Sequence, residues 1–185
     1  MRLRNVREQD LETYVGLRCD PAMMAELGGP LPRAVVEERL RKDLALATED
    51  TSWVRMIVPD GAEDDGAVGT VTLWSDEEDG VPVSEIGWMV LPGYQGRGLA
   101  KAAVRRVLDA AAADGRWGEV HANPGVANGP SNGICRSLGF RLFGERDLDF
   151  AGRVLRVNHW VVVPGEHTGA GAGDEPGTAY GSGTE

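Results

Sequence analysis

The sequence is poor in cysteine and histidine, and long apolar runs are missing. Cys19 and Cys135 are the only cysteines among 185 residues, and they match neither a metal-binding spacing nor a disulfide framework. The three histidines lie far apart, so a histidine-based metal site is not expected. No apolar stretch approaches the roughly 18 residues of a membrane span, and residues 1–10 lack the apolar centre of a signal peptide. We therefore expect a cytoplasmic protein with no metal and no membrane partner.

Basic residues are also scarce relative to acidic ones. The chain has 19 Lys and Arg against 29 Asp and Glu, a formal net charge of -10. No basic stripe is present, so nucleic acid is not an expected partner. The acidic body either attracts a cationic substrate such as an amine or serves solubility alone. The excess of arginine over lysine, with abundant alanine, is typical of a GC-rich bacterial genome.

Residues 165–185 differ in composition from the rest of the chain. They are rich in Gly, Ser, Thr and Pro and contain almost nothing apolar. Such a segment cannot bury enough surface to offset the entropy lost on ordering. We therefore predict one domain over residues 1–164 and a disordered, acidic, Gly-rich tail over residues 165–185.

Within residues 1–164, hydrophobic periodicity and turn residues predict a mixed α/β (α+β) fold of about seven strands and about four helices. Short loops between the three central strands favour antiparallel pairing, and a single strand–helix–strand unit predicts one parallel crossover. The first helix begins at Asp10, whose side chain is a suitable N-cap. The expected strands are 3–6, 52–58, 66–74, 83–91, 118–122, 140–147 and 153–163, and the expected helices are 10–18, 32–47, 98–114 and 128–139.

Three glycines, Gly93, Gly96 and Gly98, lie between the strand that ends at Leu91 and the long helix that follows. A helix N-terminus leaves backbone N–H groups unpaired and carries a partial positive charge, and glycine lets an anion approach them closely. The stretch therefore predicts a phosphate-binding site. The P-loop pattern is absent, and a dinucleotide-binding pattern fails because its third glycine is replaced by Lys101. A turn without any ligand is the alternative.

Two motifs carry a resemblance to a known family. Residues 95–100 (QGRGLA) fit the pattern Q/R-x-x-G-x-G/A, and residues 128–140 (NGPSNGICRSLGF) fit an N-x-x-S helix that ends in L-G-F. Both patterns resemble those of the GNAT superfamily of acyl-CoA-dependent N-acyltransferases, over about residues 3–163. Residues 3–18 and 149–162 look most like the branch that contains ribosomal-protein N-terminal acetyltransferases. The resemblance implies a mostly antiparallel sheet that splays apart between its fourth and fifth strands.

The resemblance also implies acetyl-CoA as the cosubstrate. The backbone of the glycine loop would hold the pyrophosphate, the preceding strand would pair with the pantetheine arm, and Asn128 would form a hydrogen bond with that arm. Arg97 and Lys101 either contact phosphates or are solvated helix charges. The expected cofactor-binding residues are Met89, Val90, Leu91, Gln95, Gly96, Arg97, Gly98, Leu99, Ala100, Lys101 and Asn128.

Glu85 is the candidate general base, because the amine must lose a proton to attack a thioester. It matches a glutamate that the family often carries on this strand. Strand alternation places Val83, Gly87 and Met89 on its own face, which would desolvate the carboxylate and raise its pKa. An outward-facing carboxylate or a structural ion pair is the alternative.

Ser131 is the candidate donor to the departing thiolate, because this branch is proposed to use the serine of its N-x-x-S motif. Many family members carry a tyrosine where this chain has Cys135, a departure that we interpret as a packed core thiol. His121 lies beside the expected splay, either as a strand histidine with a satisfied partner or as a group that orients the amine. An ordinary helix hydroxyl is the alternative for Ser131.

The sequence therefore predicts an N-acetyltransferase that transfers an acetyl group directly from acetyl-CoA to a primary amine. The branch resemblance favours a protein or peptide α-amino group as the acceptor. A small-molecule amine, such as a polyamine, an aminoglycoside or another metabolite, is the first alternative. Because Cys135 replaces the common tyrosine, a catalytically silent acyl-CoA-binding module is the second, and a nucleotide-binding protein is the third. The oligomeric state is open and includes a homodimer.

Overall fold

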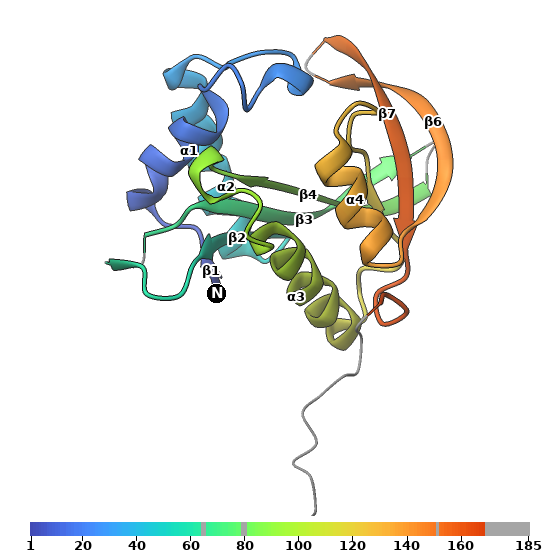
Figure 1. Ribbon diagram of the computed structural model, residues 1–185. Coiled ribbons are helices and arrows are strands. Elements are labelled where there is room, and N and C mark those ends of the chain that lie inside the picture. Colours follow the sequence, from blue (N-terminus) through green and yellow to red (C-terminus); the bar gives the residue numbers. More distant parts are fainter. Residues whose placement is uncertain (64–65, 79–80, 151, 169–185) are drawn as a thin grey trace, which may run out of the picture.

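Seven strands form one sheet in the computed structural model, which describes residues 1–63, 66–78, 81–150 and 152–168 (Figure 1). The sheet order is β1-β2-β3-β4-β5-β7-β6, with four α-helices in the described ranges, so the predicted α/β architecture is confirmed. The strands are β1 (Arg2–Asn5), β2 (Ser52–Val58), β3 (Gly69–Glu78), β4 (Val81–Val90), β5 (Val120–Ala122), β6 (Arg141–Phe150) and β7 (Arg153–Val162). The helices are α1 (Leu11–Arg18), α2 (Arg33–Glu49), α3 (Leu99–Asp114) and α4 (Gly129–Ser137).

The sheet is antiparallel except at one junction. β4 and β5 run parallel and are connected through α3, which confirms the single crossover that the sequence predicts. Their register contains only two pairs, Ser84 with Val120 and Glu85 with His121. β4 then continues to Val90, whereas β5 ends at Ala122. The predicted splay between the fourth and fifth strands is therefore present, and it begins directly after Glu85.

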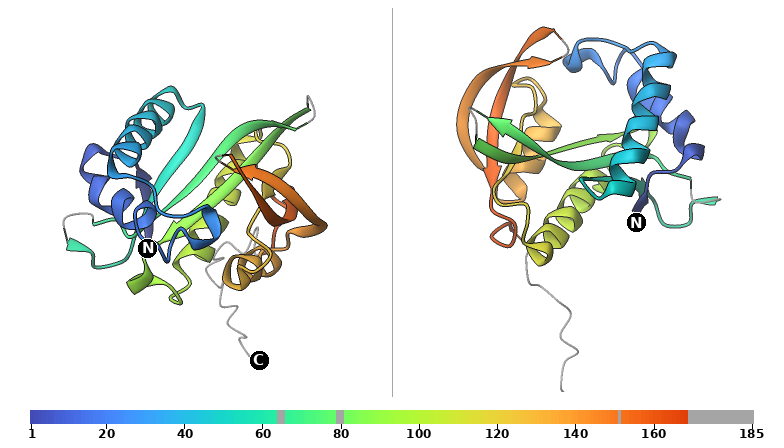
Figure 2. Two further views of the ribbon diagram at one scale, coloured as in Figure 1. Left: turned by 90° about the horizontal axis from the view of Figure 1, so that it is seen from above. Right: turned by 180° about the vertical axis from the view of Figure 1, so that it is seen from behind.

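Apolar side chains form a separate core on each face of the sheet. α3 and α4 cover one face, and α1 and α2 cover the other over β1–β3 (Figures 1 and 2). Val54, Met56 and Val58 share the second face, as their spacing predicts. The β6–β7 hairpin lies at the opposite end of the sheet from α1 and α2 (Figure 2). None of the helices in the described ranges has the length and apolar character that crossing a membrane requires.

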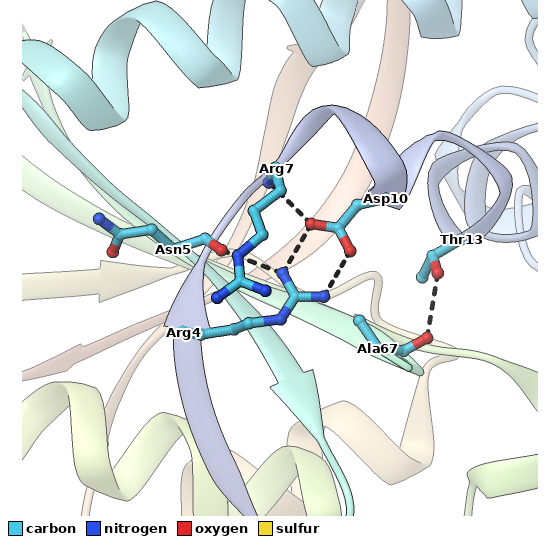
Figure 3. Close-up of polar contacts among 6 residues, drawn as sticks. All are labelled: Arg4, Asn5, Arg7, Asp10, Thr13 and Ala67. Carbon is cyan, nitrogen blue, oxygen red and sulfur yellow. Dashed lines mark hydrogen bonds and ion pairs between the residues drawn. The ribbon is translucent and has the colours of Figure 1, made fainter. Parts of the chain in front are cut away.

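Asp10 is the N-cap residue of helix α1, as predicted, but its side chain makes no capping hydrogen bond to the helix. It ends a 3-10 turn (Glu8–Asp10), and its carboxylate points back to β1 (Figure 3). The carboxylate oxygens accept hydrogen bonds from Nη1 and Nη2 of Arg4 at 2.8 and 2.6 Å, and Oδ2 also accepts the backbone N–H of Arg7 at 2.8 Å. A bidentate guanidinium is a stronger partner than a neutral helix N–H. The carboxylate therefore anchors β1 instead of starting the helix.

The first residues of the predicted tail pack on the domain. The side chain of His167 is buried, and its Nε2 lies 3.0 Å from Oδ1 of Asp109 on α3. The backbone N–H of Thr168 donates to the carbonyl of Leu138 at the end of α4. The predicted boundary after residue 164 is therefore too early, because residues 165–168 belong to the packed domain. Residues 169–185 lie outside the described part of the chain.

Candidate functional site

Gly96 and Gly98 have backbone conformations that favour glycine. Their φ angles are +72° and +74°, in the left-handed region where a Cβ is strained. A Cβ at either position would meet nothing within 4 Å, so the two residues leave bare backbone facing open space. Gly93 lies in a 3-10 turn (Pro92–Tyr94) and lacks a positive φ. Gly96 and Gly98 are therefore required by their backbone conformation, whereas Gly93 is not.

The N-terminus of α3 begins directly at this loop. Gly98 occupies the N-cap position without a capping side chain, and the backbone N–H of Ala102 donates to the carbonyl of Gly98. The N–H groups of residues 99–101 precede that bond, so they point out of the helix end. The first turn contains no acidic residue and does contain Lys101. This end of α3 therefore has the polarity of an anion site.

Arg97 folds back onto its own loop. Its Nη2 donates to the carbonyl of Gly93 at 2.7 Å, and its guanidinium carbon lies 5.0 Å from the centre of the Tyr94 ring. In this conformation Arg97 closes the loop between Gly93 and Gly98. Its positive charge still lies beside the helix end, where it adds to the attraction for an anion.

The open edge of β4 is defined by two hydrogen bonds at its ends. The N–H of Ser84 points toward β5 and lies 3.4 Å from the carbonyl of Glu119, whereas the N–H of Leu91 points the other way, to Val68 beside β3. Backbone groups alternate in direction along a strand. The backbone groups of Ile86, Trp88 and Val90 therefore face the side from which β5 has departed.

The three predicted strand residues, Met89, Val90 and Leu91, do not all direct their backbone groups to the same side of β4. Of the three predicted positions, only Val90 presents its backbone to the open edge; those of Met89 and Leu91 point toward β3. Gln95 lies against the same edge, and its Nε2 donates to the carbonyl of Val90 at 2.9 Å. The same nitrogen lies 3.3 Å from Sδ of Met23, in the segment between α1 and α2. Gln95 thus joins the glycine loop to the strand edge and to the N-terminal half.

Glu85 is half-buried at the point where the sheet splays. It pairs across β3 with Trp74, and an added Cβ at Gly87 would lie 3.4 Å from the Trp74 ring. The indole of Trp74 therefore lies against β4 at Gly87, two residues after Glu85. On its other side Glu85 is in register with His121.

His121 has a partner that the sequence did not reveal. The side chain is 8% exposed, and its Nδ1 lies 3.0 Å from Nε2 of His159 on β7. The interpretation of His121 as a satisfied strand histidine is therefore confirmed. The two imidazoles share one hydrogen bond, so one ring nitrogen donates and the other accepts.

The turn between β5 and α4 brings Asn128 and Ser131 together. Oδ1 of Asn128 accepts the backbone N–H of Ser131 at 3.1 Å, so Asn128 is the N-cap of α4. Oδ1 can accept one further hydrogen bond, and Nδ2 can donate, so the amide of Asn128 offers both kinds of group to a ligand. Ser131 is half-buried in the first turn of the helix.

Cys135 is fully buried in the core beneath the same helix. Burial raises the pKa of its thiol to about 12, because an apolar environment disfavours the thiolate. The interpretation of Cys135 as a packed core residue is confirmed. At neutral pH it is a protonated thiol with no exposed surface.

The predicted residues lie on three segments: strand β4, the loop that follows it, and the turn that follows β5. The carboxyl ends of parallel strands meet at the same edge, so the loop after β4 and the turn after β5 flank the splay that begins at Glu85. Sequence reasoning missed His159, Trp88 and Asn132. A histidine on the last expected strand is a sequence signal that could have indicated His159. Trp88 and Asn132 could be identified only from the strand register and the packing of α4.

Comparison with known proteins gives a consistent result. The family model for the acetyltransferase (GNAT) domain matches residues 1–141. A GNAT-family acetyltransferase from Bacillus anthracis superposes with a TM-score of 0.71 at 17% identity, over 88% of this chain and 93% of that chain. RimJ from Mycobacterium smegmatis, in complex with CoA-disulfide, gives 0.70 at 22% identity over 87% and 80%. A spermidine N-acetyltransferase from Vibrio cholerae, in complex with CoA and spermine, gives 0.70 at 18% identity over 88% and 95%.

Proposed function

Since the chain belongs to the GNAT acetyltransferase family, and is thereby an acetyl-CoA-dependent acetyltransferase, we propose that it transfers the acetyl group directly to the α-amino group of a protein or peptide. The observation that carries the proposal is the splay of β4 from β5 beside the glycine loop. It exposes a row of backbone groups next to an anion site and a carboxylate. Acetyl-CoA has a pyrophosphate, an amide-containing arm and a thioester in that linear order.

The residues present are suited to each part of such a ligand. The N–H groups of residues 99–101 lie at the N-terminus of α3, whose first turn has no acidic residue, and Gly96 and Gly98 beside them face open space, as a pyrophosphate requires. The outward backbone groups of Trp88 and Val90 can pair with the amides of the pantetheine arm as an added strand does. Because Gln95 already binds the carbonyl of Val90, we expect the N–H of Val90 and the groups of Trp88 to make these contacts.

Asn128 supplies the opposite side of this arm. Its Oδ1 caps α4, and we expect its Nδ2 to donate to a carbonyl or hydroxyl oxygen of the pantetheine. Lys101, in the first turn of α3, adds a positive charge for the phosphates. In this assignment the arm lies between the edge of β4 and the turn that begins α4.

Glu85 and Ser131 are the residues proposed to move or hold protons. In the reaction the amine nitrogen bonds to the thioester carbon, the carbon–sulfur bond breaks, and the amine loses a proton. Glu85, half-buried and in register with Trp74, accepts that proton directly or through water. The hydroxyl of Ser131 donates a proton to the departing sulfur, which leaves as the thiol of CoA. Cys135 does not take this role, because its thiol is buried in the core.

The chemistry of the amine and the branch resemblance both favour an α-amino group as the acceptor. An α-amino group has a pKa of about 7.7, so at pH 7 roughly one molecule in six is already neutral. A lysine amine, with a pKa of about 10.4, is neutral in fewer than about one molecule per thousand. A single half-buried carboxylate is therefore sufficient to deprotonate an α-amino group. A small-molecule amine is the second candidate, because spermidine N-acetyltransferases share the fold with TM-scores close to 0.70.

An acceptor panel tests the proposal. The protein is incubated with acetyl-CoA and either a peptide that has a free α-amine, the same peptide acetylated at its N-terminus with a free lysine, or spermidine. Release of CoA thiol and a mass increase on the first peptide alone are the expected results. Transfer to spermidine alone would replace the peptide with the small-molecule acceptor. Binding of acetyl-CoA without transfer to any acceptor would favour a catalytically silent module.

A further inference from the structure

Asn132 lies in the first turn of α4 with its side chain buried, at 5% exposure. Its amide makes four hydrogen bonds, which is all that a carboxamide can form with two donors and two acceptor sites. Nδ2 donates to the carbonyls of Gly125 at 2.9 Å and Asn128 at 2.8 Å. Oδ1 accepts from Nδ2 of Asn158 and Nε1 of Trp160, both at 2.8 Å.

The partners fix the orientation of this amide. The indole N–H of Trp160 can only donate, so it must face Oδ1. The carbonyls of Gly125 and Asn128 can only accept, so they must face Nδ2. Rotating the amide by half a turn would oppose donor to donor and acceptor to acceptor. Asn132 therefore links strand β7 to the turn before α4 in one defined geometry.

The turn held by Asn132 is itself closed and attached to β7. The N–H of Asn128 donates to the carbonyl of Gly125 at 2.9 Å, and the N–H of Val126 donates to the carbonyl of Arg156 at 3.1 Å. The N–H of Asn158 donates to the carbonyl of Pro124 at 2.9 Å. The side chain of Asn132 connects this turn to the start of helix α4, where Asn128 and Ser131 lie.

We propose that Asn132 is a positioning residue that holds Asn128 and Ser131 in place for the pantetheine arm and the thioester sulfur. The proposal rests on the proposed function of the site. Asn132 contacts the segment that would bind the arm, whereas its hydrogen bonds do not involve the glycine loop at residues 95–101. Loss of Asn132 should therefore weaken recognition of one half of acetyl-CoA and spare the other.

A calorimetric titration with two ligands distinguishes recognition of the pantetheine arm from recognition of the phosphates. Acetyl-CoA engages both segments, whereas adenosine 3′,5′-bisphosphate lacks the pantetheine arm and engages only the phosphate end. In Asn132→Asp, the carboxylate still accepts from Asn158 and Trp160 but repels the carbonyls of Gly125 and Asn128. We expect about tenfold weaker binding of acetyl-CoA, which corresponds to about 1.4 kcal/mol. Binding of adenosine 3′,5′-bisphosphate should stay within about twofold of the unmodified protein.

Two further variants separate positioning from general loss of stability. Asn132→Ala removes all four bonds without adding a charge and should show the same selective loss. Asn158→Ala removes one donor to Oδ1 and should show a smaller loss, about threefold, if the Asn132 variants do not fold. Cys135→Ala, which truncates a buried side chain on the same helix, is the matched control. It should lower the melting temperature and leave the affinities for both ligands unchanged.

The outcomes are distinct. A folded Asn132 variant with unchanged affinity for acetyl-CoA, or with equal losses for both ligands, would overturn the positioning role. The same selective loss in Cys135→Ala would also overturn it, because packing of α4 alone would then be the cause. If the unmodified protein bound neither ligand, the proposed function would be contradicted and this inference with it.

Discussion

Glu85 on β4 and His121 on β5 form the last registered pair of the parallel junction in the sheet. Beyond this pair β4 continues to Val90 with β3 on one side, and its backbone groups on the other side lose β5 as a neighbouring strand. The point at which the strands separate therefore coincides with a half-buried carboxylate. An extended ligand that replaces β5 along this edge would bring its end to Glu85, which is the arrangement that a transfer reaction needs.

Glu85→Gln tests the proposed base. Without the carboxylate, only amine that is already neutral can react, so the loss should be largest at low pH. We expect kcat/KM to fall about 100-fold at about pH 6.5 and by much less near pH 9, where an α-amine is already deprotonated. The measurement is the pH–rate profile with an N-terminal peptide. Glu119→Gln, an exposed carboxylate next to β5, is the control. Profiles of the same shape for Glu85→Gln and the unmodified protein would remove Glu85 as the base.

Gly98→Ala tests the glycine loop. Alanine at a φ of +74° is strained by about 1 kcal/mol, and relief of that strain would reorient the N–H groups of the loop. KM for acetyl-CoA should rise about tenfold, with a smaller change in kcat. Gly93→Ala is the matched control in the same loop, because its added Cβ also meets open space and its φ is not positive. Equal effects of the two substitutions would show that the left-handed backbone is not what the ligand requires.

The Cys135 thiol gives a pH dependence of stability. Burial raises its folded-state pKa to about 12, above the value of an unfolded thiol. The native state therefore keeps a proton that the unfolded chain loses, and this contribution is constant at neutral pH and is lost as pH rises from about 9 toward 12. The free energy of unfolding should fall by about 1.4 kcal/mol per pH unit in that range from this group. Urea unfolding of the unmodified protein and of Cys135→Ala isolates the difference, and parallel curves would contradict it.

Asp10→Ala should be strongly destabilising. The side chain is 4% exposed, and its removal takes the bidentate partner from the Arg4 guanidinium (Figure 3). We expect a loss of about 3–5 kcal/mol in urea denaturation, as when one member of a buried ion pair is deleted. Asp60→Ala is the comparison, because Asp60 also forms an ion pair with the N-terminal segment but is 90% exposed. Comparable losses for the two variants would mean that burial does not determine the effect.

Local sequence signals predicted most elements correctly. The helix start at Gly98 and its end near Gly115 follow from single residues whose backbone conformation is unusual. Asp10 occupies the predicted N-cap position, but its carboxylate binds Arg4 on β1 in place of the helix N–H groups, a tertiary contact that the local capping preference does not predict. The boundary at residue 165 was misplaced because average composition concealed His167, which binds Asp109 in α3.

The chemistry of the site depended more on register than on composition. The motifs identify the glycine loop and Asn128, but which groups of β4 face the open edge follows from the partners of Ser84 and Leu91. The pairing of His121 with His159 depends on the register of β5 and β7. These relationships join residues distant in the chain, so periodicity within one strand could not supply them.

Isothermal titration of the unmodified protein with acetyl-CoA, ATP and NAD is the most direct test of the central claim. The claim is that the edge of β4 and the loop at Gly96 and Gly98 form an acetyl-CoA site. It predicts saturable binding of one acetyl-CoA per chain, tighter than that of either nucleotide, because only acetyl-CoA has an arm that can pair with the strand. Absence of acetyl-CoA binding, or tighter binding of ATP or NAD, would contradict it.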